Sequence, residues 1–238
     1  EERLGKADLN SGLEYGTIAI SKYRRTDGTN SWLVTIPGTD GKRDSPFGWP
    51  QNVELMSSDS KQRMEADSAR MVQEAMKQAG INSDEPVALI GHSQGGIVAA
   101  TIASDLKDDY DVKHVVTAGS PVANHPIPDK TWVTSVEMDD ELVAALDGAP
   151  NPNSEHWLTV RGTASKSDNN PKSTFAGTPV IDAPDNKEIT HWLKYHQAAY
   201  QNATDMGSSA VKTHERHFDE ILDGDLQEVM YFEGRMSK

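Results

Sequence analysis

Hydrophobic residues along the chain fall into short apolar runs that are separated by longer polar or amphipathic segments. Seven of these runs have the length and the β-branched or aromatic content of strands. They lie at 15–22, 31–36, 86–90, 112–118, 131–138, 156–161 and 229–232. Asp27 and Gly28 stand between the first two runs and form a dipeptide that is favoured in hairpin turns. We therefore expect a hairpin near the N-terminus, followed by further strands.

The segments between the later strands carry apolar residues at helical spacing. Helices are predicted at 60–79, 96–106, 190–206 and 209–222. In the first helix Met64, Met71 and Ala75 recur at this spacing, and Gly80 is placed to end it. Strands that alternate with helices predict an α/β fold with a mostly parallel central sheet flanked by helices.

Two polar segments, at 40–57 and 162–189, are predicted to be loops. The first carries Phe47 and Trp49, which would suit the wall of an apolar site, and the second is rich in Ser, Asn, Lys and Pro. No internal repeat or domain boundary is visible, so we expect a single domain over residues 1–238. That length is sufficient for a full hydrophobic core and an enclosed site.

The sequence Gly91-His92-Ser93-Gln94-Gly95 fits the G-x-S-x-G pattern of a nucleophile elbow. The apolar run at 86–90 precedes it and the small, apolar helix at 96–106 follows it, which is the strand–turn–helix context that the pattern requires. The glycines matter because the serine backbone is strained at such a turn and a larger neighbour would collide with it. We expect Ser93 to be a nucleophile.

Composition narrows the range of functions. The formal net charge of −14 argues against nucleic acid as a partner, because binding phosphate backbones requires clustered Lys and Arg. The chain has no cysteine, which excludes disulfides, thiolate metal ligands and cysteine nucleophiles. No apolar run approaches the ~20 residues of a membrane span, and no metal or cofactor is expected.

The sequence leaves the compartment and the oligomeric state open. The chain begins with Glu1 in place of Met, so we expect a trimmed or processed N-terminus. Its composition fits a cytoplasmic domain and an exported soluble domain equally well.

A serine nucleophile needs a base, and the base needs an acid that orients it. In the α/β-hydrolase order both follow the serine in sequence. The strand predicted at 131–138 runs directly into Asp139, Asp140 and Glu141. Catalytic groups gather at the carboxyl ends of strands in open α/β sheets, so this acidic turn is the expected source of the acid.

Two of the eight histidines are candidates for the base. His191 lies at the first turn of the helix predicted at 190–206, where its side chain can point back over the strand ends. His196 lies further along the same helix, in a place that suits packing or exposure, so we favour His191 and keep His196 as the alternative. His114 is expected in the interior, and His214 and His217 are expected on an exposed helix.

The oxyanion of an acyl-transfer reaction needs backbone N–H donors that are already aimed at it. One donor is expected from Gln94, the residue after the nucleophile. The other is expected from Gly38 and Thr39, which follow the strand at 31–36. A glycine permits close approach of the backbone, and Thr39 adds a hydroxyl.

Four segments together resemble the α/β-hydrolase superfamily. They read W-L-V-T-I-P-G-T at 32–39, N-V-E-L-M at 52–56, V-A-L-I-G-H-S-Q-G-G at 87–96 and H-V-V-T-A-G-S-P-V at 114–122. More narrowly, the chain is similar to lipase/esterase-like serine hydrolases of actinobacteria, which are related to the PGAP1-like and class 3 lipase groups. The resemblance implies ester or acyl-bond hydrolysis, no cofactor, Ser93 as nucleophile, and oxyanion donors at Gly38, Thr39 and Gln94.

The acid is where the chain departs from these relatives, which read D-x-V-P-A-L-D-G. The corresponding run here is E-L-V-A-A-L-D-G at 141–148, so a gapless match places Glu141 at the acid position. Asp140 stands one residue earlier and has the usual residue type. Both Asp140 and Glu141 therefore remain candidates.

These observations predict a serine hydrolase that cleaves carboxylic ester bonds through a Ser-His-Asp/Glu triad and an acyl-enzyme intermediate. The expected substrate is a small-molecule or lipid-like ester. The negative charge disfavours adsorption to anionic bilayers and so favours soluble esters. A thioesterase, acyltransferase or peptidase would use the same triad, and a catalytically silent binding module would keep the fold alone.

Overall fold

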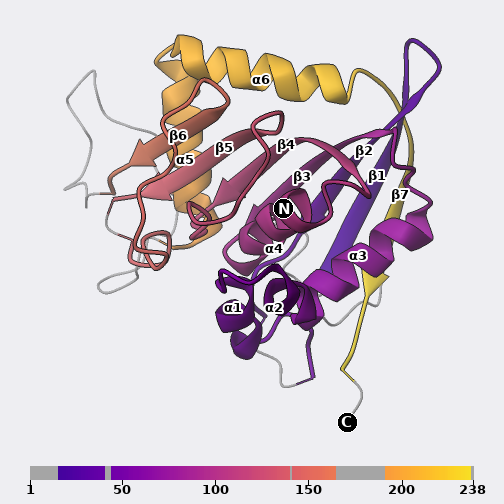
Figure 1. Ribbon diagram of the computed structural model, residues 1–238. Coiled ribbons are helices and arrows are strands. Elements are labelled where there is room, and N and C mark those ends of the chain that lie inside the picture. Colours follow the sequence, from indigo (N-terminus) through magenta and orange to yellow (C-terminus); the bar gives the residue numbers. More distant parts are fainter. Residues whose placement is uncertain (1–15, 41–43, 140, 165–190, 237–238) are drawn as a thin grey trace.

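The computed structural model of the chain describes residues 16–40, 44–139, 141–164 and 191–236. Within these residues seven strands form one sheet in the order β6-β5-β4-β3-β2-β1-β7 (Figure 1). The strands are β1 (Thr17–Arg25), β2 (Asn30–Ile36), β3 (Pro86–His92), β4 (Asp111–Ala118), β5 (Trp132–Met138), β6 (Trp157–Gly162) and β7 (Gly224–Glu233).

The sheet is parallel from β2 to β6 and antiparallel at the end that contains β1 and β7. The predicted hairpin joins β1 to β2, and Gly28 has the positive φ of 84° that its turn requires. Because β3, β4 and β5 run parallel, their carboxyl ends lie at the same edge of the sheet. The prediction of a mostly parallel α/β sheet is confirmed.

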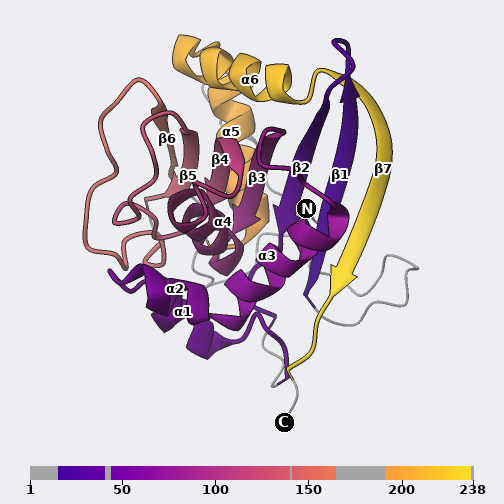
Figure 2. The same ribbon diagram turned by 45° about the vertical axis from the view of Figure 1, so that its right-hand side comes forward.

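Helices cover both faces of the sheet. They are α1 (Trp49–Leu55), α2 (Ser60–Glu65), α3 (Asp67–Ala79), α4 (Gln94–Asp105), α5 (Leu193–Asp205) and α6 (Ser209–Ile221). Helices α3 and α4 lie on one face, and α5 and α6 lie on the other (Figure 2). The main hydrophobic core fills the first face, with Val87, Leu89 and Ile102 among its fully buried members. A smaller cluster under α5 and α6 is built on Val136 and Val160.

The structure differs from the sequence prediction in the first three helices, α1 to α3. The segment predicted as one helix at 60–79 is two helices, since Ala66 has an extended ψ of 127° and ends α2. The segment predicted as a loop at 40–57 contains α1, which begins after Gly48 and has Pro50 in its first turn. Proline is tolerated there because the first N–H groups of a helix have no partner within the helix.

The C-terminal part follows the predictions more closely. Strand β7 begins five residues earlier than the apolar run at 229–232. The sequence pattern missed its first half, which is mostly polar and is exposed at the sheet edge. The loop predicted at 162–189 falls mostly outside the described residues. None of the helices in the described ranges has the length and apolar character needed to cross a membrane.

Candidate active site

Ser93 lies at a sharp turn between β3 and α4. Its φ of 54° and ψ of −124° place it in a region that side chains rarely adopt, and it is the single non-glycine residue with positive φ among those described. Such a conformation costs of order 1–3 kcal/mol and persists only where the surroundings enforce it. The strained serine that the G-x-S-x-G pattern predicts is therefore present.

The glycines around Ser93 allow the turn to close. A Cβ on Gly91 would lie 2.2 Å from the carbonyl carbon of Gly95, and a Cβ on Gly95 would lie 2.4 Å from the carbonyl oxygen of Ile36. Real Cβ atoms do not approach backbone so closely. Any side chain at either position would therefore push the elbow away from β2 or α4.

His191 lies beside Ser93 at hydrogen-bonding distance. The Ser93 hydroxyl donates to Nε2 of His191 over 2.8 Å. On the other side of the ring, Nδ1–H of His191 donates to Oε1 of Glu141. His191 precedes α5 by two residues, so it belongs to the segment before the helix and not to its first turn.

Glu141 is the acidic residue that the structure places against His191. Its side chain is fully buried. Burial acts to raise its pKa, but the hydrogen bonds and charges of His191 and His196 outweigh burial and lower it from 4.5 to about 2. Asp140, the other candidate, lies outside the described residues. Asp147 is turned elsewhere, since its carboxylate accepts from the main-chain N–H of Ala123 over 2.7 Å.

The second candidate base, His196, contacts Glu141 and not Ser93. Its Nε2 lies 2.7 Å from Oε2 of Glu141, so one carboxylate is shared between two histidines. His196 is 1% exposed, in agreement with the packing role considered for it. The structure thus brings both candidate histidines to the site, in different positions.

His92 is a site residue that the sequence did not single out. Its Nε2–H donates over 2.7 Å to the main-chain carbonyl of His191 and so ties that segment to the elbow. Burial is the main cause that lowers its pKa from 6.5 to about 4. Its position one residue before Ser93 was the available signal, because residues flanking the nucleophile face the same edge.

The expected oxyanion donors lie next to Ser93. A Cβ on Gly38 would be 3.4 Å from Cβ of Ser93, so the backbone there passes close to the nucleophile. The N–H of Gln94 begins α4 and has no acceptor within the helix. Asn52 of α1 accepts from the Gln94 side chain over 3.1 Å and donates to Oγ1 of Thr39 over 3.4 Å. Helix α1 thereby connects the two donor segments.

Large apolar side chains are exposed on α1 and on the segments that carry Glu141 and His191. Leu142, which follows Glu141, is 71% exposed, and Trp192, which follows His191, is 54% exposed. Trp49 begins α1 and is 73% exposed. Phe47, in contrast, is fully buried in the core, so it does not line a site as the polar segment at 40–57 suggested.

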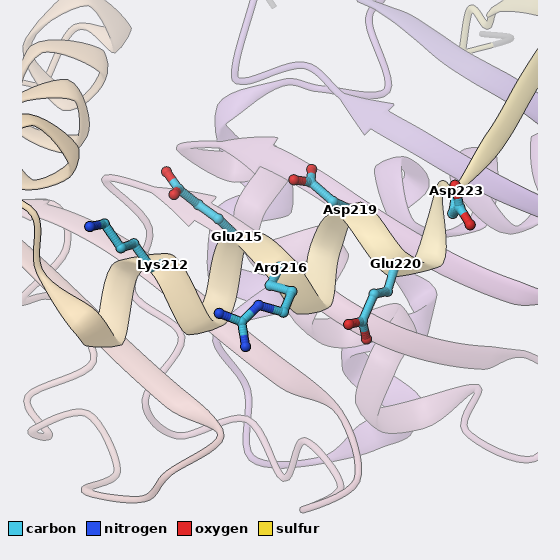
Figure 3. A pocket seen from close by; sticks show the side chains of 6 residues that line it. All are labelled: Lys212, Glu215, Arg216, Asp219, Glu220 and Asp223. Carbon is cyan, nitrogen blue, oxygen red and sulfur yellow. The ribbon is translucent and has the colours of Figure 1, made fainter.

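Two hollows lie along α6, away from Ser93. One, of about 470 Å³, is bordered by two basic and four acidic residues (Figure 3): Lys212, Glu215, Arg216, Asp219, Glu220 and Asp223. The other, of about 350 Å³, lies between α6 and the sheet beside His114 and His214. His114 is buried as expected, but His214 is 3% exposed and not at the surface. We therefore locate the candidate site from the hydrogen bonds that join Ser93, His191 and Glu141, and not from the volume of a hollow.

Comparison with known proteins identifies the family. The model of the PGAP1-like alpha/beta domain family matches residues 52–181, which is more than half of the 238 residues. The matched range includes Ser93 and Glu141, whereas His191 lies beyond it. Among curated proteins, none matches the chain significantly. The narrower resemblance to actinobacterial and class 3 lipases stays a prediction. With its hydrolase-type sheet and its matched range, the chain belongs to the PGAP1-like alpha/beta domain family.

Proposed function

We propose that the chain is a serine hydrolase that cleaves carboxylic ester bonds. The observation that carries this proposal is the continuous hydrogen-bonded path from Ser93 through His191 to Glu141. The strained backbone of Ser93 and the hydrolase-type fold of the family support it. A nucleophile within reach of a base, with the base held by a third group, is the arrangement that covalent catalysis requires.

In the proposed mechanism, Ser93 Oγ attacks the acyl carbonyl while its proton passes to Nε2 of His191. The tetrahedral intermediate collapses as His191 returns that proton to the leaving alcohol, and the acyl group remains on Ser93 as an ester. Water then attacks this ester with His191 as base, which releases the acid and restores Ser93. Glu141 stays ionised and keeps the proton of His191 on Nδ1.

We propose that the oxyanion binds to main-chain N–H groups at Gln94 and at Gly38 or Thr39. The close passage of Gly38 beside Ser93 supports this position, as does the place of Gln94 at the first position of α4, where a main-chain N–H has no partner within the helix. Loss of one such donor costs about 3 kcal/mol of transition-state stabilisation in enzymes of this kind.

The proposed substrate is a small-molecule or lipid-like ester with an apolar part. Leu142 and Trp192 follow Glu141 and His191 in the chain and expose apolar surface that such a substrate could contact. The net charge of −14 opposes adsorption to an anionic bilayer, so a dispersed ester fits better than a lipid within a membrane.

The test is hydrolysis of p-nitrophenyl esters from acetate to palmitate, with thioester and amide analogues alongside. Ser93→Ala is expected to abolish ester turnover while its circular dichroism stays unchanged. Ser209→Ala, an exposed serine at the start of α6, serves as the matched control and should keep full activity. Equal turnover by Ser93→Ala and the wild type, or no turnover of any ester by the wild type, would overturn the proposal.

A further inference from the structure

His196 is a second histidine on Glu141 that the mechanism above does not use. Its Nε2 lies 2.7 Å from Oε2 of Glu141, and its Nδ1 lies 3.1 Å from the main-chain carbonyl oxygen of Trp192. The side chain is 1% exposed, so both of these contacts are shielded from water. Each ring nitrogen of a buried histidine thus faces an oxygen atom.

The two partners determine where the protons of His196 lie. A main-chain carbonyl only accepts hydrogen bonds, so Nδ1 must carry a hydrogen to bond with Trp192. The Glu141 carboxylate also accepts, because it is ionised: burial acts to raise its pKa, but the hydrogen bonds that it accepts from the two histidines are among the causes that lower it to about 2. Nε2 must then carry a hydrogen as well. A ring with both hydrogens is an imidazolium with one positive charge.

Among the groups around His196, the Glu141 carboxylate provides the negative charge that balances this imidazolium. The His92 ring lies 5.7 Å away between centroids and is neutral at pH 7, since burial lowers its pKa to about 4. The His191 ring lies 6.3 Å away, and its Nε2 faces the Ser93 hydroxyl. Gly119 leaves room for the pair, because a Cβ there would lie 2.7 Å from Glu141 Oε1 and 2.8 Å from His196 Nε2.

Resting on the function proposed above, we propose that His196 is a positioning residue: a buried imidazolium that holds the second oxygen of Glu141 and partly cancels its charge. Glu141 then orients His191 but stabilises the proton taken from Ser93 less strongly than an unpaired carboxylate would. His191 consequently returns that proton to the leaving alcohol more readily. The charge of His196 thus sets the balance between the two roles of His191, base and acid.

The first test needs neither a variant nor turnover. In wild-type protein labelled with ¹⁵N at histidine, ¹H–¹⁵N spectra at pH 7 are expected to show both ring nitrogens of His196 protonated. A spectrum with one unprotonated ring nitrogen at His196 would overturn the proposal, because the charge that it invokes would be absent.

The second test compares His196→Gln with His156→Gln, a half-buried histidine that lies away from Glu141. Glutamine keeps an amide donor but removes the charge. In His196→Gln the pH midpoint at which His191 gains its proton should rise by about one unit, the usual effect of one charge at this range. The acid limb of kcat/KM should move with it, whereas His156→Gln should match the wild type.

The outcomes separate this inference from the proposed function. Lower activity in His196→Gln with an unchanged midpoint for His191 would mean that His196 only packs, and would contradict the inference. If no ester is hydrolysed but the His191 midpoint still rises in His196→Gln, the ester function fails while the role of His196 toward His191 stands.

Discussion

At the scale of single residues, Glu141 joins the two histidines of the candidate site. Its fully buried carboxylate contacts both His191 and His196. The sequence could not choose between Asp140 and Glu141, because residue type favoured one and register favoured the other. Gly119 provides the space that the Glu141 carboxylate occupies, since a Cβ there would lie 2.7 Å from its Oε1.

The first prediction concerns the acid. Glu141→Gln is expected to lower kcat by roughly 10³–10⁴-fold, because an amide can stabilise the wrong tautomer of His191 and does not balance its charge. The measurement is steady-state hydrolysis of the best p-nitrophenyl ester.

Two neighbouring carboxylates provide matched controls for this prediction. Asp140→Asn and Asp139→Asn should both keep activity within about twofold of the wild type, well short of the loss expected for an acid of the triad. A large loss in Asp140→Asn with an active Glu141→Gln would reverse the assignment of the acid.

At the scale of elements, α1 joins the turn after β2 to the start of α4. The side chain of Gln94 donates to the carbonyl of Gly48 over 2.8 Å and to Asn52 over 3.1 Å. Local sequence predicted a loop here, because a helix of seven residues with Pro50 in its first turn has weak intrinsic stability. Contacts with α4 that are distant in sequence stabilise it.

A second prediction follows for Asn52. Asn52→Ala removes the link between Gln94 and Thr39, so we expect kcat to fall about tenfold, less than the loss of a direct oxyanion donor, with KM nearly unchanged. Gln78→Ala, an exposed glutamine on α3, is the control. A rise in KM with unchanged kcat would show instead that α1 only binds substrate.

The contact between α6 and β4, where His114 meets His217, is expected to make stability depend on pH. Burial is the main cause that lowers the pKa of His114 from 6.5 to about 3, and it also lowers the pKa values of His214 and His217. Neutral rings are therefore favoured in the folded state. The stability that they contribute is complete above pH 6.5 and is lost as the pH falls from 6.5 toward 3.

The measurement for this contact is the urea midpoint of unfolding at pH 7.5 and pH 5. The wild type should unfold at a lower urea concentration at pH 5, and His114→Gln should show a smaller difference between the two pH values. This variant is needed because His92 and His125, whose pKa values are also lowered to about 4, act in the same direction. An equal difference in both proteins would show that His114 contributes nothing.

At the scale of the whole molecule, much of the fold followed from sequence pattern. The parallel strands and α4 are strongly apolar, so β3, β4 and β5 were predicted within one or two residues at most ends. The break at Ala66 and the polar start of β7 were missed, because the first is a backbone bend within a continuous helical pattern and the second depends on pairing with β1.

The candidate site was predictable to a similar extent: local motifs could be found in the sequence, and contacts between distant segments could not. The elbow at Ser93 could be predicted because it is a local motif with a fixed spacing. The contact of Glu141 with two histidines could not be predicted, since His191 and His196 come from a segment far along the chain that folds back beside the end of β5. His92 was missed for a similar reason: its partner is a main-chain carbonyl, which leaves no mark in the sequence.

We propose above that Ser93 is a nucleophile activated by its surroundings. The most direct test is labelling with a fluorophosphonate, followed by intact mass measurement and peptide mapping of the wild type and of Ser93→Ala. We expect one phosphonyl adduct on the wild type, located at Ser93, and none on the variant. Equal labelling of both proteins, or an unlabelled wild type that is fully folded, would contradict it.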